Sequence, residues 1–535
     1  MGESPRISLL DGVDVKKPVF LTAALPYANG KLHIGHIVEY TEADIMSRFF
    51  KIAGVCAGYY CASDVHGTPI EVSAQKAGVT PDVLVEKTHA HNKGVLDKYG
   101  VQFTAFSTTG SSQNKFLTEW FWKRLTEKGL LYQKEMELSY CEHCKRFLPD
   151  RFVKGSCPKC GAPDQYGDAC EKCNATYSTT DLVAPYCVIC LNSSSRKYSE
   201  HTFFKLSAFR EQLSSWLSSC KGLQQDVVNN VRVWLDDELK DWCISRDAPY
   251  YGFLVPGKTD KYLYVWFDAP IGYLASAATT LENPEQVITK WNSSRVVHVI
   301  GKDILYFHLL FWPAVLMGAG LKLPDDVIVH GHLLWNGEKL SKSRGTMIDA
   351  QDFLSVVPSE MFRFYCAAHL RRSMSDIDFT VDAFLSSVNN DLVANIANFC
   401  YRVLSFTMTK LEGKVWSCSS VDEEVHERIL SRAKSAVHSY SRFELADAVR
   451  DILEVGSIGN SFIQLNAPWK LLKENPDRAK EVLATGVNIA KILSVLLKPI
   501  LPSYADALEK QLGLNDLSLA DVNFSYENRS IVGAS

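Results

Sequence analysis

Four closely spaced cysteine pairs constrain this chain more than any other feature of its sequence. They lie between Cys141 and Cys190, and two residues separate the cysteines of each pair. Such a pair forms a tight knuckle that can supply two thiolates to one tetrahedral zinc ion. A disulfide framework is typical of small secreted domains, whereas this chain has 535 residues and no N-terminal export-signal pattern. Metal binding is therefore the better interpretation of the eight cysteines.

The spacing leaves two ways to combine the knuckles. Sequential pairing would place the first two knuckles on one zinc ion and the last two on another. Nested pairing would place the middle two on one ion and the outer two on a second. Four sulfur ligands leave no open position, so both zinc sites are expected to be structural. The predicted ligands are Cys141, Cys144, Cys157, Cys160, Cys170, Cys173, Cys187 and Cys190.

Length and composition favour a multidomain, water-soluble protein. A chain of 535 residues is too long for one core, so two to four domains are expected. The net charge of −4 does not exclude nucleic acid, because a local basic face is enough to bind it. No apolar run is long enough to cross a bilayer. We expect a cytoplasmic protein without a membrane partner.

Hydrophobic patterning predicts an α/β fold that is interrupted and then followed by helices. A buried strand over 18–25, a helix from Ile34 and a strand over 55–62 form the start of a parallel sheet. The cysteine segment breaks this pattern, which resumes near residue 243. From about residue 385 apolar residues recur at helical spacing, which predicts a bundle. The last dozen residues are expected to form a loose tail.

The stretch ALPYANGKLHIGH, residues 24–36, places two histidines at the start of the first predicted helix. A helix N-terminus has unpaired N–H groups and a partial positive charge, both of which favour phosphate. His33 and His36 lie on neighbouring parts of the helix surface, and Gly35 between them has no side chain to block an anion. Taken alone, the pair fits either an anion site or two ordinary surface histidines.

A second basic stretch, KLSKS, lies some three hundred residues later. Lys339 and Lys342 are mobile charges in a Gly- and Ser-containing loop that could follow phosphates as charge develops. Taken alone, a solvated basic loop is the simpler interpretation.

Together, HIGH and KLSKS resemble the signature pair of the class I aminoacyl-tRNA synthetases. Longer segments look like the methionyl family of that class: ALPYANG, DVHGTP, ISRDAPYYG, YVWFDAPIGY, IGKDILYFH and VHGHLLWNGEKLSKSRGT. The resemblance extends from about residue 17 to 520. Leu340 stands where the signature loop usually has Met, an apolar exchange that should preserve packing.

The resemblance implies an enzyme that converts L-methionine and ATP to methionyl-adenylate and pyrophosphate, and then transfers methionine to the terminal adenosine of tRNA(Met). It implies Mg²⁺ with ATP, two structural Zn²⁺ ions in the nested arrangement, and a monomer. The expected domains are a Rossmann-like catalytic domain in two halves (1–129 and 243–330), a zinc-knuckle insertion (130–242), a KLSKS linking segment (331–384), an α-helical anticodon-binding domain (385–520) and a tail (521–535).

Roles for single residues follow from their match to the motifs of the family. Catalytic roles are implied for His33, His36, Lys339 and Lys342. ATP binding is implied for His33, His36, Gly301, Asp303 and Lys342, with Asp268 a weaker candidate. Methionine binding is implied for Ala24, Leu25, Tyr27, Asp64, Trp266, Ala269, Pro270, Tyr273, Ile304 and His308, with Asp64 on the ammonium group. Reading of the CAU anticodon is implied for Asn398, Arg402 and Trp469.

Each assignment has a simpler alternative. Aromatic residues near the motifs are more often core than ligand pocket, and Arg246 could hold a carboxylate or phosphate or form only a surface ion pair. A cysteinyl synthetase would need a zinc-binding cysteine just before HIGH, and 24–32 contains none. A non-catalytic relative would be expected to have lost His33, His36 or Lys342. A small-molecule adenylyltransferase would have no use for the helical bundle.

Overall fold

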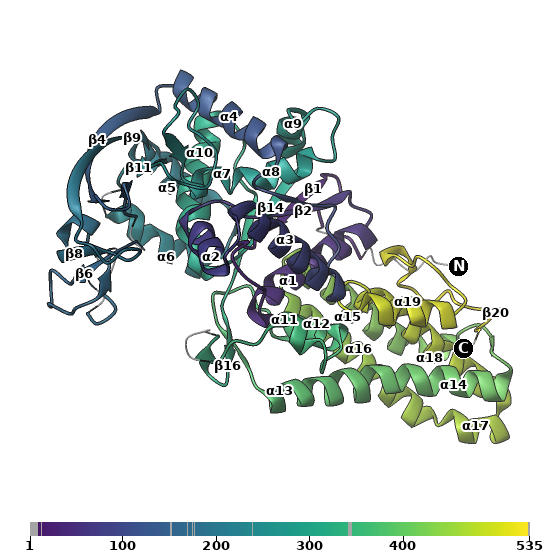
Figure 1. Cartoon of the computed structure of the whole chain (residues 1–535). Coiled ribbons are helices and arrows are strands. Elements are labelled where there is room, and N and C mark those ends of the chain that lie inside the picture. The colour runs from purple at the N-terminus through teal and green to yellow at the C-terminus, as the bar shows by residue number, and fades with distance from the viewer. Residues whose placement is uncertain are drawn as a thin grey trace.

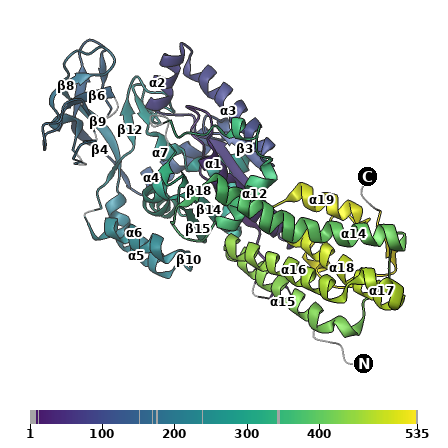
Figure 2. The same ribbon diagram turned by 90° about the horizontal axis from the view of Figure 1, so that it is seen from below.

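The computed structural model describes residues 9–11, 13–149, 152–167, 170–173, 175, 177–237, 239–340 and 345–532. An α/β body lies in the middle, a cysteine-rich module projects from one end, and a helical bundle extends from the other (Figures 1 and 2). Among the described residues, no helix combines the length and apolar character needed to span a membrane.

A six-stranded parallel sheet forms the centre of the body. Its strand order is β10–β15–β14–β1–β2–β3. The strands are β1 (Val19–Ala23), β2 (Ala57–Ser63), β3 (Ala105–Thr108), β10 (Gly222–Leu223), β14 (Arg295–Gly301) and β15 (Asp326–His330). The chain order reverses between β1 and β14, and open parallel sheets bind ligands at the carboxyl ends of strands at such a point.

Alternation along β1 supplies two separate cores. Leu21 belongs to the core formed with helix α1 (Ile34–Ile52), whereas Phe20 belongs to the core on the opposite face. That second core includes α8 (Ile271–Ala278) and α10 (Trp312–Ala319). Successive side chains of a strand point to opposite faces, so a strand covered on both sides is apolar throughout. This is why residues 19–23 form a continuous buried run.

A long antiparallel ribbon carries the cysteine module away from the body. Strands β4 (Leu131–Cys141) and β9 (Ser195–Phe204) pair along their length, and Figure 1 shows this ribbon curving outward. The module contains β6 (Val153–Ser156), β7 (Gln165–Tyr166) and β8 (Val183–Cys187) in one small sheet. After the ribbon, α5 (Arg210–Ser219) and α6 (Gln225–Asp236) flank β10, which pairs with β15. Part of the segment between 130 and 242 thus belongs to the central sheet.

The segment that follows β15 links the body to the bundle. It contains a small sheet of β16 (Leu333–Trp335), β17 (Glu338–Lys339) and β18 (Ile377–Phe379), together with α11 (Ala350–Phe353) and α12 (Ser359–His369). The bundle helices are α13 (Val381–Ser386), α14 (Asn398–Leu411), α15 (Glu423–Ser441), α16 (Leu445–Asn466), α17 (Pro468–Glu474), α18 (Pro476–Leu497) and α19 (Pro502–Gln511). Helix α18 is its centre, because every residue from Val482 to Leu497 is buried.

The C-terminal stretch differs from the loose tail expected from the sequence. Residues Arg529–Ser530 pair with Lys414–Val415 in a short two-stranded sheet. Tyr526 is buried, and its hydroxyl donates to the Leu512 carbonyl at 2.6 Å. The side-chain amide N–H of Asn488 donates to the Tyr526 carbonyl, and its amide oxygen accepts from the Tyr526 N–H. Isolated apolar residues in a polar stretch gave no periodic signal, so sequence patterning missed this packing.

Close packing at Gly331 gives a test of the fold. A Cβ at this position would lie 2.1 Å from the carbonyl oxygen of Ser375, so Gly331→Ala forces backbone to move. We expect a lower melting temperature, corresponding to a loss of about 1–3 kcal/mol. Gly94→Ala is the matched control: that glycine lies within α3 (Pro81–Lys98) with open space around it and should gain about 0.5–1 kcal/mol. Equal melting temperatures for the two variants would contradict the packing described.

Candidate active site and metal centres

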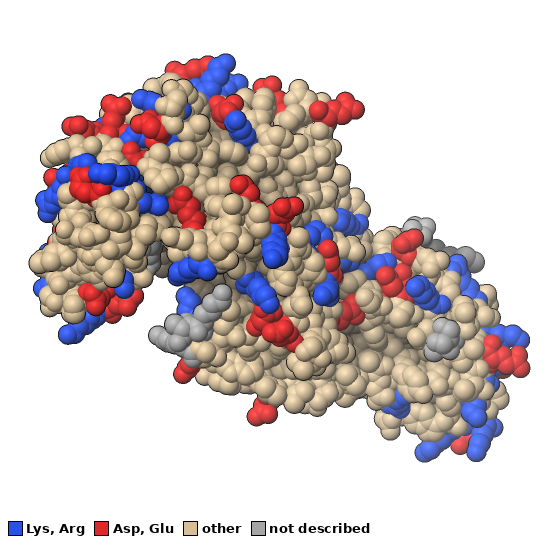
Figure 3. Space-filling view, viewed as in Figure 1, with Lys and Arg blue, Asp and Glu red and all other residues tan. Residues whose placement is uncertain are grey.

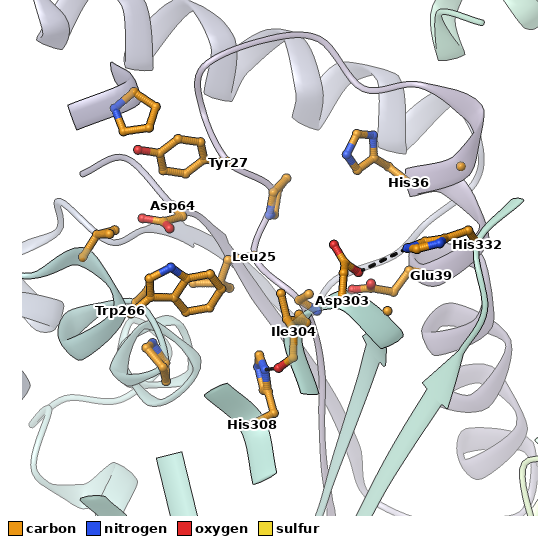
Figure 4. Close-up of a pocket in the computed structure, with 18 of the residues that line it drawn as sticks. Leu25, Tyr27, His36, Glu39, Asp64, Trp266, Asp303, Ile304, His308 and His332 are labelled. Atoms are coloured by element: carbon orange, nitrogen blue, oxygen red, sulfur yellow. Dashed lines mark hydrogen bonds and ion pairs between the residues drawn. The ribbon is translucent and has the colours of Figure 1, made fainter. Parts of the chain in front are cut away.

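A cavity of about 570 Å³ opens at the carboxyl ends of β1, β2 and β14 (Figure 4). All ten residues assigned to methionine by the resemblance line it: Ala24, Leu25, Tyr27, Asp64, Trp266, Ala269, Pro270, Tyr273, Ile304 and His308. The residues His33, His36, Gly301, Asp303 and Lys339 line the same cavity. Lys342 lies outside the described residues. One space therefore brings together motifs that are up to three hundred residues apart.

The two histidines meet at the start of α1. The His33 and His36 ring centroids are 3.8 Å apart. The backbone N–H of His33 donates to Nδ1 of His36 at 3.1 Å, which leaves the proton of a neutral His36 ring on Nε2. Burial and the neighbouring His33 lower the pKa of His36, so the ring stays neutral at pH 7. A Cβ at Gly35 would lie 3.0 Å from the His33 ring, which explains why glycine stands there.

The loops that follow two of the strands form one wall of the cavity. The N–H of Ala28 donates to the Asp64 carbonyl at 2.8 Å, and the N–H of Asp64 donates to the Pro26 carbonyl at 2.9 Å. The Tyr27 hydroxyl donates to the His66 carbonyl at 2.6 Å. These bonds join the loop that follows β1 to the loop that follows β2. Tyr27 and Asp64 are thereby held at neighbouring points of the same wall (Figure 4).

Asp64 is a buried carboxyl group with an unusual titration. Its Oδ1 accepts long hydrogen bonds from the Thr109 hydroxyl at 3.4 Å and the His66 N–H at 3.5 Å. Burial and the nearby charge of Asp268 raise the pKa of Asp64 to about 8. Asp268 itself pairs with His66 at 2.6 Å, and it does not line the cavity. A bound cation at Asp64 would relieve the cost of burying its charge.

The apolar part of the cavity is walled by aromatic rings. Trp266 stacks on Phe307 with ring centroids 3.8 Å apart and an angle of 7° between the planes. Behind it, Nδ1 of His308 donates to the Ile304 carbonyl at 3.1 Å, and Nε2 accepts from the Tyr273 hydroxyl at 2.7 Å. Burial lowers the pKa of His308 to about 4, so this ring is neutral. The wall suits an uncharged and polarizable side chain.

The polar end of the cavity contains an ionised carboxylate beside a glycine. Asp303 pairs with His332 at 3.7 Å, the ion pair drawn in Figure 4, and this contact lowers the pKa of Asp303 to about 2. A Cβ at Gly301 would lie 2.8 Å from the Asp303 carboxylate. Glycine therefore allows the carboxylate to lie over the end of β14. An ionised carboxylate here can accept hydrogen bonds from sugar hydroxyl groups.

Sequence reasoning missed a buried acid–base pair beneath this end. Glu39 accepts a hydrogen bond from the Ala24 N–H at 2.5 Å and lies 3.4 Å from Nε2 of His330. Hydrogen bonding to Glu39 outweighs burial and raises the pKa of His330 to about 9. Both residues line the cavity. A Glu within a helical pattern and a His at a strand end carry no distinctive signal, so only their proximity in space identifies them.

Arg246 is expected from the sequence either to bind a ligand carboxylate or phosphate or to form only a surface ion pair, and its contacts combine features of both. It lines the cavity, and its guanidinium lies 3.8 Å over the ring of Tyr264. It also donates to the Ser245 carbonyl at 2.7 Å. The side chain is therefore oriented by the protein rather than extended into solvent, and it faces the site where a ligand carboxylate or phosphate would lie.

The eight cysteines form two groups of four at the module. One contains Cys141, Cys144, Cys187 and Cys190, and the other contains Cys157, Cys160, Cys170 and Cys173. This is the nested arrangement. The sulfur–sulfur distances of 3.4 and 3.9 Å in the first group and 3.8 and 3.6 Å in the second fit a tetrahedron with zinc–sulfur bonds of about 2.3 Å, whose edge is about 3.8 Å. Backbone N–H groups also point at Cys141, Cys157 and Cys170 sulfurs, which favours thiolates.

A second, smaller pocket lies on the bundle. Arg402 and Trp469 line it, together with the exposed Tyr401, and the Arg402 guanidinium lies 5.9 Å over the Trp469 ring. Asn398 is exposed one turn before Arg402 but does not line this pocket. The three residues assigned to the anticodon thus lie on one part of the bundle surface, and two of them, Arg402 and Trp469, line the same pocket.

Family models and relatives match nearly the whole chain, and they agree with the family that the sequence motifs resemble. The model for class I tRNA synthetases (M) matches residues 19–404, and the model for the anticodon binding domain of methionyl tRNA ligase matches residues 414–528. A methionine–tRNA ligase of Leptospira biflexa is 41% identical over 517 residues, which cover 96% of this chain and 76% of that protein. One of Myxococcus xanthus is 41% identical over 506 residues, covering 93% and 72%.

Solved structures are similar in fold. A crystal structure of the Mycobacterium tuberculosis methionyl-tRNA synthetase bound by methionyl-adenylate superposes with a TM-score of 0.81 at 22% identity, covering 97% of this chain and 99% of that one. With the sequence matches, this similarity shows that the chain belongs to the methionyl-tRNA synthetase family of class I aminoacyl-tRNA synthetases.

Proposed function

We propose that this chain is a methionine–tRNA ligase that forms methionyl-adenylate from L-methionine and ATP and transfers methionine to the terminal adenosine of tRNA(Met). The observation that carries the proposal is the shared cavity. It combines a carboxyl group for an ammonium ion, an aromatic slot for an apolar side chain and a helix N-terminus with two imidazoles. These groups fit an amino acid with an apolar side chain and a nucleoside triphosphate.

Methionine would bind at the wall formed by the strand-end loops. Both hydrogen bonds to the Asp64 side chain are accepted by Oδ1, so among the described residues Oδ2 is available to the substrate ammonium group. The thioether would lie against Trp266 and near the Tyr273–His308 pair. Sulfur contacts with aromatic edges favour methionine over an aliphatic side chain of similar length.

ATP would bind across the end of β14 and the start of α1. Asp303 would accept from the ribose hydroxyls, and Nε2–H of His36 would donate to phosphate. The methionine carboxylate attacks the α-phosphorus, a P–O bond forms, and the bond to the pyrophosphate oxygen breaks. His33, Lys339 and Lys342 would neutralise charge on the departing pyrophosphate, and Mg²⁺ held with ATP would add to this neutralisation. The protein positions the reactants and forms no covalent bond.

The remaining assignments follow from the same proposal. Acidic and basic side chains are interspersed over the face shown in Figure 3, so on this face attraction for RNA would come from local groups. The pocket of Arg402 and Trp469 would hold unstacked anticodon bases, with Asn398 beside it. We also propose two structural Zn²⁺ ions. We propose the predicted domain boundaries with two changes: β10 belongs to the catalytic domain, and the described part of the C-terminal stretch belongs to the bundle. The cytoplasmic location and the monomeric state stay predictions.

Amino-acid-dependent ATP–pyrophosphate exchange tests the activity. Among the twenty amino acids, methionine should give the fastest exchange, and Asp64→Asn should lose exchange by about a hundredfold or more, because the ammonium group loses a charged partner. Asp268→Asn is the comparison: Asp268 is also buried but does not line the cavity, so exchange should fall by less than in Asp64→Asn. No exchange with methionine in the wild-type chain would rule out the proposed function.

The titration of Asp64 predicts how methionine binding depends on pH. Below about pH 8 the empty site holds a neutral Asp64, and binding an ammonium group requires that proton to leave. The affinity for methionine should therefore rise as pH rises, by up to about tenfold between pH 6.5 and 7.5. Calorimetric titration with methionine measures this directly. The slope should be absent in Asp64→Asn, and an unchanged affinity over this range in the wild-type chain would place the ammonium group elsewhere.

Metal analysis tests the two cysteine groups. The purified chain should contain two zinc ions, and Cys144→Ser with Cys190→Ser should reduce the content to one, because these residues belong to the same group. Cys160→Ser with Cys173→Ser should remove the other ion instead. If removing one residue from each group left one ion bound, the nested pairing would be wrong.

A further inference from the structure

An ion pair with no solvent exposure joins the helix of the two histidines to the bundle. Asp44 lies on α1, Arg363 lies on α12, and the exposed fraction of both side chains is 0%. Oδ2 of Asp44 is 2.7 Å from Nη2 of Arg363 and also 2.7 Å from Nε of Arg48. Its Oδ1 accepts from the Gln102 N–H at 2.8 Å. Both oxygens of the carboxylate are thus bonded, and the bonds to Arg363 and Gln102 fix the position of α1.

The guanidinium of Arg363 continues the connection to the end of α18. Its Nε donates to the Ile500 carbonyl at 2.8 Å, and its Nη2 donates to the Pro499 carbonyl at 3.0 Å. Both residues directly follow α18, where backbone carbonyls carry the negative end of the helix dipole. One planar cation therefore bonds a carboxylate of α1 and the terminus of α18 at the same time. A second contact supports this connection: Tyr440 stacks on Phe49 of α1 and donates to the Leu496 carbonyl at 3.0 Å.

Helix α18 leads from this point to the second pocket. Leu483 near its start lines that pocket together with Arg402 and Trp469. The helix has 22 residues, which corresponds to a length of about 33 Å. Because every residue from Val482 to Leu497 is buried, this part of the helix is closely packed by its neighbours, and close-packed elements transmit displacement. Figure 2 shows α18 inside the bundle, with α17 at the end far from the body.

A merely stabilising role does not explain why charges stand here. Buried ion pairs are no more stabilising than well-packed apolar residues, but their hydrogen bonds fix one relative placement of the joined elements. The contacts of Arg363 are directional and reach carbonyls of two backbone segments, Pro499–Ile500 and Tyr99. We propose that Asp44 and Arg363 are positioning residues that hold α1, and with it His33 and His36, in a placement set by α18. The phosphate-binding geometry then depends on what the bundle contacts at Trp469.

The first test measures adenylate formation without tRNA, and it rests on the proposed function. Arg363→Lys keeps the charge but lacks the planar fork, and Asp44→Asn keeps the shape but lacks the charge. For both variants we expect kcat of methionine-dependent exchange to fall by about tenfold or more, while KM for methionine stays unchanged. The kcat values are normalised to the concentration of chains that can form adenylate. Arg478→Lys is the matched control, because Arg478 pairs with Asp422 at 2.5 Å within the bundle and should keep the wild-type kcat.

The results separate the possible roles. A less stable Arg363→Lys protein with wild-type kcat would make the pair purely structural and overturn the proposal. If Arg363→Lys and Asp44→Asn do not fold, Tyr440→Phe removes only the hydroxyl bonded to α18 and should lower kcat by about threefold; an unchanged kcat there would also overturn it. A wild-type chain inactive with methionine would instead refute the proposed function.

The second test asks whether α18 carries the effect of the anticodon pocket. Trp469→Ala should lower kcat for aminoacylation of tRNA(Met), and it should lower it by a smaller factor when Arg363→Lys is already present. Adenylate formation without tRNA should be unaffected by Tyr198→Ala, which changes an exposed aromatic residue on strand β9 of the ribbon. Independent effects, in which the factors for Trp469→Ala and Arg363→Lys multiply, would overturn the role of α18.

Discussion

The placement of helix α1 is the constraint on which the rest of the structure depends. Its N-terminus presents His33 and His36 to the cavity, and its buried face packs on β1 and β2. Its middle is bonded through Asp44 to the loop after α3 and to Arg363 of α12, which in turn donates to the carbonyls of Pro499 and Ile500 after α18. A displacement of about 1 Å at such a helix start is enough to lower a rate by about a hundredfold. The extensive anchoring of α1 is therefore understandable from its position at the phosphates.

The two proposed substrate sites adjoin because the sheet brings the residues that line them to one edge. Strand β1 ends in the loop with Tyr27, and the same loop leads into α1. Strand β14 ends at Gly301, beside the Asp303 carboxylate. Since β1 and β14 are neighbours at the point where the strand order reverses, the amino-acid wall and the nucleotide wall adjoin without any further element. Glu39 bonds both sides, through the Ala24 N–H and through His330.

The sequence predicted the parts of this fold that have periodic or spaced signals. Strands β1 and β2, the start of α1 and the bundle helices follow from patterning. The family resemblance assigned the HIGH residues and chose the nested cysteine groups where spacing left two arrangements open. Three features gave no such signal. Strand β10 has only two residues, the C-terminal stretch packs through isolated apolar side chains, and the Glu39–His330 pair is a contact across 291 positions. Such contacts depend on where whole elements lie, which local patterning does not determine.

The apolar clusters that the described residues of the cysteine module form are small, which supports the two metal sites proposed for it. Its larger apolar cluster contains only six buried residues, of which Cys141 and Cys187 are themselves predicted ligands. The smaller cluster contains three, of which Cys157 and Cys170 are ligands. Segments this small do not bury enough apolar surface to offset the loss of chain entropy. Since two residues of the larger cluster and two of the smaller one are also predicted metal ligands, we expect metal binding and folding of the module to be coupled.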